Sequence, residues 1–180
     1  GDLATTLTGE SGIAVRSSGQ ATQRPILRGY SGDRFLITSD NFELGDMSNS
    51  TADHAVSMEI SSAESIELIR GPETLVYGSN TIAGIINILT PIYRKQKLDS
   101  PNYKFLMGHE SSNQSNLLSA NINVPLKSYQ VFTNYTKRTA RDQSSPLGDL
   151  KNTALMKDDF TFAITKFGQK NYTTLQIKDF

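Results

Sequence analysis

The sequence predicts a small α+β unit followed by an antiparallel β-sheet, and three observations support this. Near the end of the first half, two apolar runs flank a Gly-Pro corner and a short helical stretch. After residue 102, apolar and polar residues alternate with period two, as in half-buried strands. Charge also divides the chain: residues 1–91 hold five arginines, no lysine and eleven acidic residues, whereas residues 92–180 hold thirteen basic and seven acidic residues. Two units with different surroundings are therefore expected.

Composition excludes several classes of protein. Without cysteine, the chain can have neither a disulfide framework nor a thiolate metal site. No stretch approaches the ~20 apolar residues of a membrane-spanning helix, and the first residues do not have the pattern of a signal peptide, which we would expect upstream if the protein is exported. Phosphate-binding glycine loops and nucleophile elbows are missing, and only two histidines occur, so an enzyme is not expected.

Three elements are expected before residue 65. "DLATTLTG", residues 2–9, predicts a short helix ending at Gly9. "RPILRG", residues 24–29, and "DRFLITSD", residues 33–40, predict two strands. The turn "YSGD" separates them, so a tight connection between the two strands is expected.

A strand, a corner and a second strand are expected next. "SIELIR", residues 65–70, is the first strand, and Gly71-Pro72 ends it because proline fixes φ and lacks the N–H that a ladder needs. A short helix, "ETLVY" at residues 73–77, follows, with Gly78 as its stop. "IINILT", residues 85–90, returns as a strand. These parts are interpreted as structural rather than catalytic.

Five strands are expected in the second half, each close to the ten-residue length of a membrane-barrel strand. Their sequences are "NYKFLMGHE", "LLSANINVPL", "YQVFTNYTKRT", "DFTFAITKF" and "NYTTLQIKDF". Short turns, "PLKS" and "GQKN", lie at one end, and the longer polar loops "ESSNQSN" and "ARDQSSPLGDLKNTALMKD" lie at the other. An outer-membrane barrel has such an arrangement. A soluble antiparallel sheet would alternate in the same way, so this half alone leaves both open.

The first half resembles a known family. "RPILRGYSGDRFLITSDN" and "IELIRGPETLVYGSNTIAGIINILT" look like the plug domain of TonB-dependent outer-membrane receptors. Its hallmark positions fall on Arg28, Gly29, Arg70, Gly71, Pro72, Tyr77, Gly78, Gly84 and Asn87. Two mild departures are Ala83-Gly84, where the family has a glycine pair, and Asp40-Asn41, where it has Asp-Gly. The implied fold is an α+β plug fragment over residues 1–91, a linker over 92–102, and antiparallel strands of a transmembrane β-barrel over 103–180.

The resemblance also implies a function. Such a receptor lies in the bacterial outer membrane, contacts its lipid, and imports a scarce nutrient when the TonB energy-coupling complex pulls on the plug. It requires no cofactor, carries out no catalysis and binds no nucleic acid. Arg28 and Arg70 would pair with acids such as Glu67 or Glu73. Five strands cannot close a barrel of about 22 strands, so the chain is expected to be a fragment of a larger receptor.

One stretch, "DMSNSTADHAVSMEI" at residues 46–60, has the composition of a metal site. It resembles a segment of the zinc-uptake branch of these receptors, which implies that Asp53 and His54 bind transported zinc, completed by ligands from elsewhere. His54 could instead only pack or cap a loop. Siderophore, haem, cobalamin and copper remain alternative cargoes, and a soluble β-rich binding or adhesion module remains the alternative class.

Overall fold

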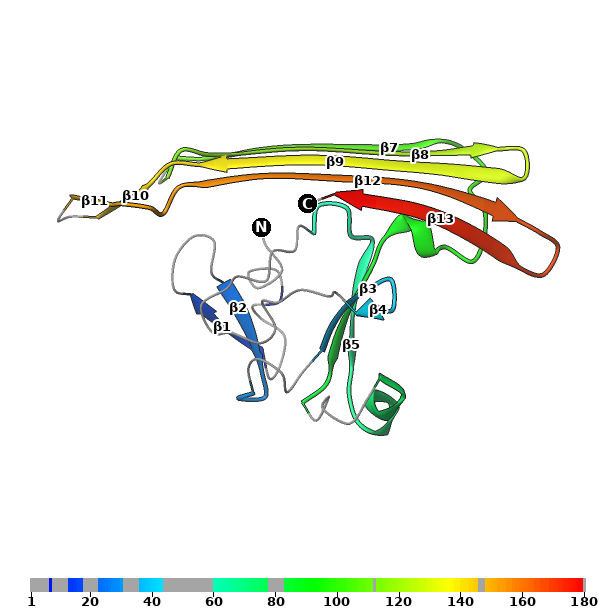
Figure 1. The fold of residues 1–180 in the computed structure, drawn as a ribbon, viewed down its shortest axis with the longest axis horizontal. Coiled ribbons are helices and arrows are strands. Elements are labelled where there is room, and N and C mark those ends of the chain that lie inside the picture. The colour runs from blue at the N-terminus through cyan, green and yellow to red at the C-terminus, as the bar shows by residue number, and fades with distance from the viewer. Residues whose placement is uncertain are drawn as a thin grey trace. The chain divides into compact units, whose positions relative to one another are not determined.

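The computed structural model describes residues 7, 13–17, 23–30, 36–43, 60–77, 83–111, 113–145 and 148–179. The chain divides into two compact units, Gly1–Thr90 and Pro91–Phe180. Strands make up most of the described elements (Figure 1). Within these residues, no helix is both long enough and apolar enough to cross a membrane.

A four-stranded mixed sheet organises the first unit. Its order is β4-β3-β6-β5, where β3 is Leu36–Ser39, β4 is Phe42–Glu43, β5 is Ser65–Ile69 and β6 is Ile85–Leu89. β3 and β6 are parallel, and the other pairs are antiparallel. All residues from 85 to 88 are buried, because β6 is a central strand that is covered on both faces.

The turn after the second strand differs from the expected one. β1 (Ile13–Ser17) pairs with β2 (Gln23–Leu27), and the chain then turns at Arg28-Gly29, where φ is 51° and 80°. Leu27 and Tyr30 exchange two backbone hydrogen bonds of 2.9 Å across this turn. Two positive φ values in a two-residue loop are typical of a type I′ turn. β2 thus pairs with β1, whereas β3 pairs with β4 and β6. Residues 31–35, which include most of the expected turn "YSGD", lie outside the described residues, so the tight connection between residues 24–29 and 33–40 stays a prediction.

The Gly-Pro corner leads into a 3-10 helix. This helix, η3, spans Pro72–Tyr77 and so begins at the proline, one residue before the expected short helix. Proline suits a first helical position, since its fixed φ is helical and its missing N–H would have no partner there. The backbone N–H and the hydroxyl of Thr74 donate to the carbonyl of Gly71, at 3.1 and 2.8 Å. The first turn of this 3-10 helix thus supplies hydrogen-bond donors to the carbonyl of Gly71 at the corner.

The hydrophobic core of the first unit lies against one face of β6. Its buried members are Leu7, Leu27, Ile37, Ala83, Ile86 and Ile88. Partly buried side chains pack around them: Ile13, Ile60, Ala63, Ile66 and Leu68. Of the helix expected over residues 2–9, only Leu7 is described, and it is helical. Side chains alternate along β6, so Asn87 belongs to the opposite face.

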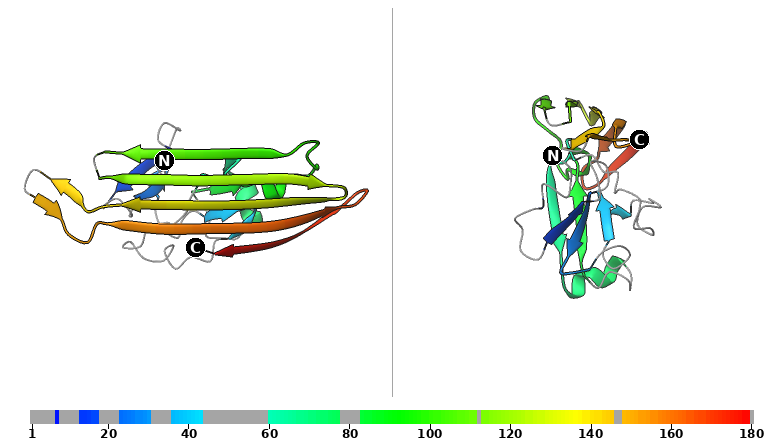
Figure 2. Two further views of the ribbon diagram at one scale, coloured as in Figure 1. Left: turned by 90° about the horizontal axis from the view of Figure 1, so that it is seen from above. Right: turned by 90° about the vertical axis from the view of Figure 1, so that its left-hand side faces the viewer.

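The second unit is a five-stranded antiparallel sheet of order β13-β12-β9-β8-β7 (Figures 1 and 2). Its strands are β7 Asn102–Glu110, β8 Ser115–Leu126, β9 Tyr129–Ala140, β12 Leu155–Phe167 and β13 Tyr172–Asp179. All five expected strands are present. The long loop expected between the third and fourth is shorter, because both strands extend into it and a small hairpin, β10 (Gln143–Ser145) with β11 (Gly148–Leu150), lies within it.

Burial on this sheet is the reverse of that in a water-soluble protein. One face, here called the polar face, has buried residues that are mostly polar: Ser119, Asn121, Asn123, Gln130, Asn134, Thr136, Asp159 and Thr165. The other, the apolar face, exposes large hydrophobic side chains: Tyr103, Phe105, Met107, Leu118, Tyr135, Phe160, Ile164, Leu175 and Ile177. A soluble antiparallel sheet buries its apolar face instead.

Apart from Met156 on β12, the apolar face forms a band whose edge on the side of the β9–β12 loop crosses the strands diagonally. On β7 the apolar residues extend to Met107, but the same row of the sheet holds Lys137 on β9 and Asp158 on β12. On β13 the apolar residues extend only to Ile177. The row of Ile177 contains Tyr103 of β7, which lies four residues before Met107. Between β7 and β13 the edge therefore shifts by four residues along the strands, about 13 Å, while it crosses four strand spacings, about 19 Å. This ratio means that the strands are inclined by about 35° to the normal of the band edge. Barrel strands in membranes are tilted by a similar angle.

The segment that enters this sheet contacts its polar face. η4, Pro91–Tyr93, places the buried Ile92 against Phe132 and Ala163. Farther along, the backbone N–H of Leu98 donates to Oε1 of Gln130 at 2.8 Å. Much of the segment expected as a linker, residues 92–102, therefore packs on the strands of its own unit.

Candidate functional site

A row of polar side chains crosses the sheet of the first unit. Thr38 on β3 and Glu67 on β5 are both in register with Asn87 on the strand between them. The hydroxyl of Thr38 donates to Oδ1 of Asn87 at 2.8 Å, and Nδ2 of Asn87 donates to Glu67 at 3.2 Å. Asn87 is fully buried, so these bonds satisfy an amide that would otherwise be costly to bury.

The same amide holds the turn between β3 and β4. Asp40 and Asn41 have φ of 54° and 65°, a conformation that Asp and Asn tolerate better than most residues. Asn87 donates from Nδ2 to Oδ1 of Asn41 at 2.8 Å and accepts from the Asn41 backbone N–H at 3.1 Å. Tyr77 adds a long bond of 3.4 Å from its hydroxyl to the same Asn41 oxygen. Two hallmark residues, Tyr77 and Asn87, thus meet at this turn.

A second set of hydrogen bonds, which local sequence patterns do not predict, joins Asp40 to Thr90 at the end of the first unit. Asp40 is buried, and its carboxylate accepts from the backbone N–H of Thr90 at 2.7 Å and from the Thr90 hydroxyl at 2.8 Å. The signal in the sequence was the Asp-Asn turn directly after an apolar strand. It was interpreted only as a turn, because a partner fifty residues away is not visible in a local pattern.

Two hallmark glycines have conformations that favour glycine. Gly71 has φ of 84° at the corner. Gly84 has φ of 133°, and an added Cβ would lie 2.9 Å from the carbonyl oxygen of Ile69 and from a methyl of Leu27. Real Cβ atoms do not approach a backbone oxygen so closely, so Gly84 permits the close contact of β6 with its neighbours. Gly78 lies outside the described residues.

The predicted ion pairs of the first unit stay a prediction. Arg28 is exposed in its turn, and Arg70 is partly buried after β5. Glu67 accepts a hydrogen bond from Asn87, while Glu73 is exposed in the first turn of η3.

The predicted metal residues, Asp53 and His54, lie outside the described residues, as does the rest of the stretch from 44 to 59. Among the residues that are described, no group of three or more His, Asp or Glu side chains could hold a metal ion. The zinc site therefore remains a hypothesis from the sequence.

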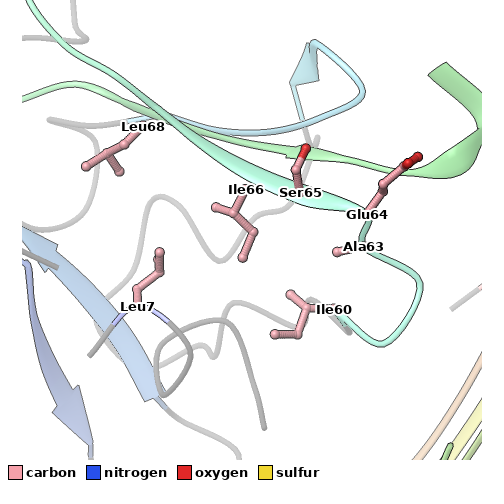
Figure 3. A pocket seen from close by; sticks show the side chains of 7 residues that line it. All are labelled: Leu7, Ile60, Ala63, Glu64, Ser65, Ile66 and Leu68. Carbon is pink, nitrogen blue, oxygen red and sulfur yellow. The ribbon is translucent and has the colours of Figure 1, made fainter. Parts of the chain in front are cut away.

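A pocket in the first unit has no evident chemistry. It encloses about 500 Å³ and is lined by Leu7, Ile60, Ala63, Glu64, Ser65, Ile66 and Leu68. Figure 3 shows that the apolar side chains converge on one space, whereas the carboxylate of Glu64 points away from them. Its lining belongs largely to the hydrophobic core, so we assign it no binding role.

Cross-strand pairs organise the polar face of the second unit. Ser119 and Thr136 hydrogen-bond through their hydroxyls at 2.9 Å, and Asn134 donates to Asn121 at 2.9 Å. Nearer the loop end, Lys157 pairs with Asp159 at 3.2 Å, and both side chains are mostly buried. The sequence predicts Asp159 in a strand and Lys157 in the preceding loop, and its local pattern indicates no role for either residue.

Several known proteins are similar to this chain in sequence. The family model described as "TonB-dependent Receptor Plug Domain" matches residues 1–85. A protein of Acinetobacter baumannii described as "Probable TonB-dependent siderophore receptor PirA" is 33% identical over 84 residues, 44% of this chain and 11% of that protein. "Vitamin B12 transporter BtuB" of Photobacterium profundum is 35% identical over 81 residues, again 44% of this chain and 13% of that protein. The matched segments thus span only about a tenth of the length of these relatives.

Solved structures share the fold over nearly the whole chain. The structure described as "Copper transporter OprC" covers 96% of this chain with a TM-score of 0.79 and 20% identity, and the match takes up 27% of that protein. A ferric enterobactin receptor, PfeA, covers 98% with a TM-score of 0.73 and 15% identity, over 30% of its own chain. At these identities the likeness concerns the fold, and it includes both units.

Proposed function

We propose that this chain is part of a receptor that imports a scarce nutrient across the bacterial outer membrane, because residues 1–85 match the family model of the TonB-dependent receptor plug domain. The matched proteins are receptors and transporters, and the chain is not an enzyme. A receptor of this kind would lie in the outer membrane.

The reversed burial of the five-stranded sheet carries this proposal. Large hydrophobic side chains are exposed on one face, while polar side chains on the other face bond to one another. That distribution suits a wall with lipid on one side and a polar interior on the other. The diagonal edge of the apolar band fits strands that cross a membrane at a tilt, and it would have no reason to exist on a soluble adhesion module.

We further propose that the first unit is a plug that is moved by the TonB complex. The described part of the unit contains a small core and two sets of specific hydrogen bonds: the buried polar row at Asn87, and the bonds from Thr90 to the carboxylate of Asp40. The unit is therefore held together by specific hydrogen bonds as well as by apolar packing. Specific bonds of this kind can be broken and remade, which suits a domain that rearranges during transport.

The proposed cargo is a metal ion or a metal complex, and zinc is the candidate that Asp53 and His54 suggest. Two ligands leave zinc short of its tetrahedral set, so other residues or water would complete the site. Relatives named for siderophores, vitamin B12 and copper support import of scarce nutrients in general.

The test is metal uptake by cells in which the full-length receptor is the only high-affinity route. We expect Asp53→Ala and His54→Ala to lower zinc accumulation at least tenfold at equal receptor levels. His109→Ala is the matched control, since His109 is the other histidine and hydrogen-bonds Asn116 at the end of β7. Unchanged zinc uptake in both variants would reject zinc. Absence of uptake for every metal source would reject metal import itself.

A further inference from the structure

The end of the five-stranded sheet that carries the short turns is basic. Two segments form this end: residues 122–133 around the β8–β9 turn and residues 162–175 around the β12–β13 turn. Neither segment contains an acidic residue, and together they contain three exposed lysines, Lys127, Lys166 and Lys170. Among the described residues, no carboxylate forms an ion pair with any of the three lysines.

The long-loop end of the same sheet has charges of both signs. Residues 136–159 contain acidic as well as basic residues. Lys137 pairs with Asp158 at 3.7 Å, and Lys157 pairs with Asp159 at 3.2 Å. The two ends of the sheet therefore differ in charge, and only the short-turn end has an excess of cations.

The lysines of the short-turn end belong to one corner of the sheet. The backbone N–H of Phe167, at the end of β12, donates to the carbonyl of Ser128 in the β8–β9 turn at 2.8 Å. Lys127 and Lys166 are the chain neighbours of these two residues, and Lys170 lies in the turn that follows β12. Like charges gathered in this way repel one another, so the stability of the sheet gives no reason for the arrangement.

The segment that enters the sheet adds to this charge. Residues 94–99 contain three basic residues and one acid, Asp99. The ammonium of Lys97 donates a hydrogen bond to the carbonyl of Lys127, so this segment brings a further cation to the β8–β9 turn. The corner therefore keeps its net positive charge when Asp99 is included.

Lys166 also marks the lower edge of the apolar band. It lies on the apolar face in the row of Leu126 and Tyr129, and its ammonium is 6.0 Å from the centre of the Tyr129 ring. Lysine and tyrosine at such a boundary place their apolar parts against hydrocarbon and their polar ends at the level of lipid headgroups. The next row toward the middle of the sheet is entirely apolar: Val124, Val131, Ile164 and Leu175.

From this arrangement we propose that Lys127, Lys166 and Lys170 bind the phosphate headgroup of an acidic phospholipid, with Tyr129 beside them. The inference rests on the proposed function, because it takes the apolar face to contact lipid. Short turns of outer-membrane barrels face the periplasm, so the lipid would belong to the periplasmic leaflet. Flexible ammonium groups suit a mobile phosphate, since they donate as point charges without a fixed geometry. The apolar row above Lys166 would contact the acyl chains of the same lipid.

The test measures the lipid next to this corner in the full-length receptor, reconstituted in phosphatidylcholine vesicles. A fluorophore on Leu175→Cys, at an exposed position of the apolar row, is quenched by doxyl-labelled phosphatidylglycerol or doxyl-labelled phosphatidylcholine. We expect stronger quenching by phosphatidylglycerol in wild type. Each single substitution, such as Lys166→Gln, should lower the relative affinity for phosphatidylglycerol by up to ~5-fold, the effect of one cation at an anionic membrane surface. High salt should reduce the preference.

The matched control is Lys137→Gln, the same loss of charge on the apolar face at the long-loop end, where Lys137 pairs with Asp158. It should leave the preference at Leu175→Cys unchanged. Lys166→Arg should retain the preference, since it keeps the charge. Combined substitution of Lys127, Lys166 and Lys170 by Gln should abolish it. Thermal unfolding is measured for every variant, and the single variants carry the test if the combined one does not fold.

Three results would reject the lipid site. Equal quenching by the two lipids in wild type would show that the corner does not select acidic lipid. A preference that persists in the combined variant would show that the lysines do not cause it. Loss of binding to the purified TonB complex, with the lipid preference retained, would assign the lysines to a protein partner.

Uptake assays separate this site from the proposed import function. A wild-type receptor that imports metal without preferring phosphatidylglycerol would reject the lipid site alone. A receptor that shows the lipid preference but imports no nutrient would reject the import function and support the lipid site.

Discussion

Thr90 donates two hydrogen bonds to the carboxylate of Asp40, one from its backbone and one from its hydroxyl, at 2.7 and 2.8 Å. The two residues are fifty positions apart, and both are buried. Asp40 follows the last residue of β3 and begins a turn with positive φ, while Thr90 follows the last residue of β6. The carboxylate therefore joins the ends of two parallel strands and fixes the point at which the chain leaves the first unit.

Removing this carboxylate should loosen the first unit. Asp40→Ala leaves two buried donors without an acceptor, each at a cost of roughly 1–3 kcal/mol. Thr90→Val removes one of the two bonds and should have a smaller effect. Hydrogen exchange of the β3 and β6 amides in the full-length receptor measures both, with Ser65→Ala on the exposed side of β5 as the control. Equal exchange in Asp40→Ala and wild type would contradict a stabilising role.

Gly84, directly before β6, and Gly108, within β7, offer a comparison of two glycines. An added Cβ at Gly84 would lie 2.9 Å from a backbone oxygen, in a conformation with φ of 133°, whereas at Gly108 its nearest neighbour would be 3.7 Å away. We expect Gly84→Ala to destabilise the first unit by at least ~2 kcal/mol, from backbone strain and overpacking together. Gly108→Ala should be tolerated. Folded yield and hydrogen exchange of the receptor measure the difference, and comparable behaviour of the two variants would refute the steric argument.

Asn87 should not accept replacement by its acid. In Asn87→Asp an oxygen replaces Nδ2, which donates to Oδ1 of Asn41 and to Glu67. Hydrogen-bond acceptors would then face one another at a buried position. The expected cost is several kcal/mol, since buried unsatisfied and like-charged groups are penalised strongly. Asn102→Asp, at an exposed end of β7, is the control. Faster exchange around β6 in Asn87→Asp alone would support the network; wild-type exchange would show that the amide protons of Asn87 are dispensable.

The two faces of the barrel wall can be compared at adjacent residues of β7. Phe105 is on the apolar face and 67% exposed, and Leu106 is on the polar face and 40% exposed. Phe105→Arg should lower the free energy of unfolding from lipid vesicles by ~2–4 kcal/mol, as arginine does near the middle of a membrane. Leu106→Arg should change it little. If both substitutions have the same effect, the apolar face does not contact lipid.

Local patterns in the sequence were enough for the strands of the second unit, because alternation with period two is itself the physical cause of a two-faced sheet. They could not show which face was buried: Leu118 and Ile164 alternate with polar neighbours in a soluble sheet as well. Ends of strands were also missed. β12 begins at Leu155 because backbone pairing with β9 continues past the apolar residues.

The first unit was predicted less completely, and the reason is distance along the chain. The parallel pairing of β3 with β6 joins residues about fifty positions apart, so no local pattern reports it. The hydrogen bonds from Thr38 to Asn87 and from Thr90 to Asp40 depend on that pairing. Family resemblance identified Asn87 as a position of interest, but only the register explains what its amide does.

The two sheets also differ in the order in which they can assemble. In the second unit, every neighbour in the five-stranded sheet is the next long strand along the chain, so each hairpin can form on the edge left by the previous one. Contacts that are local in sequence favour fast folding. The first sheet must wait for its central strand β6, which is the last of its four strands in the chain. Until that strand is in place, β5 has no partner in the sheet and β3 pairs only with β4, so the first unit is the slower of the two to complete.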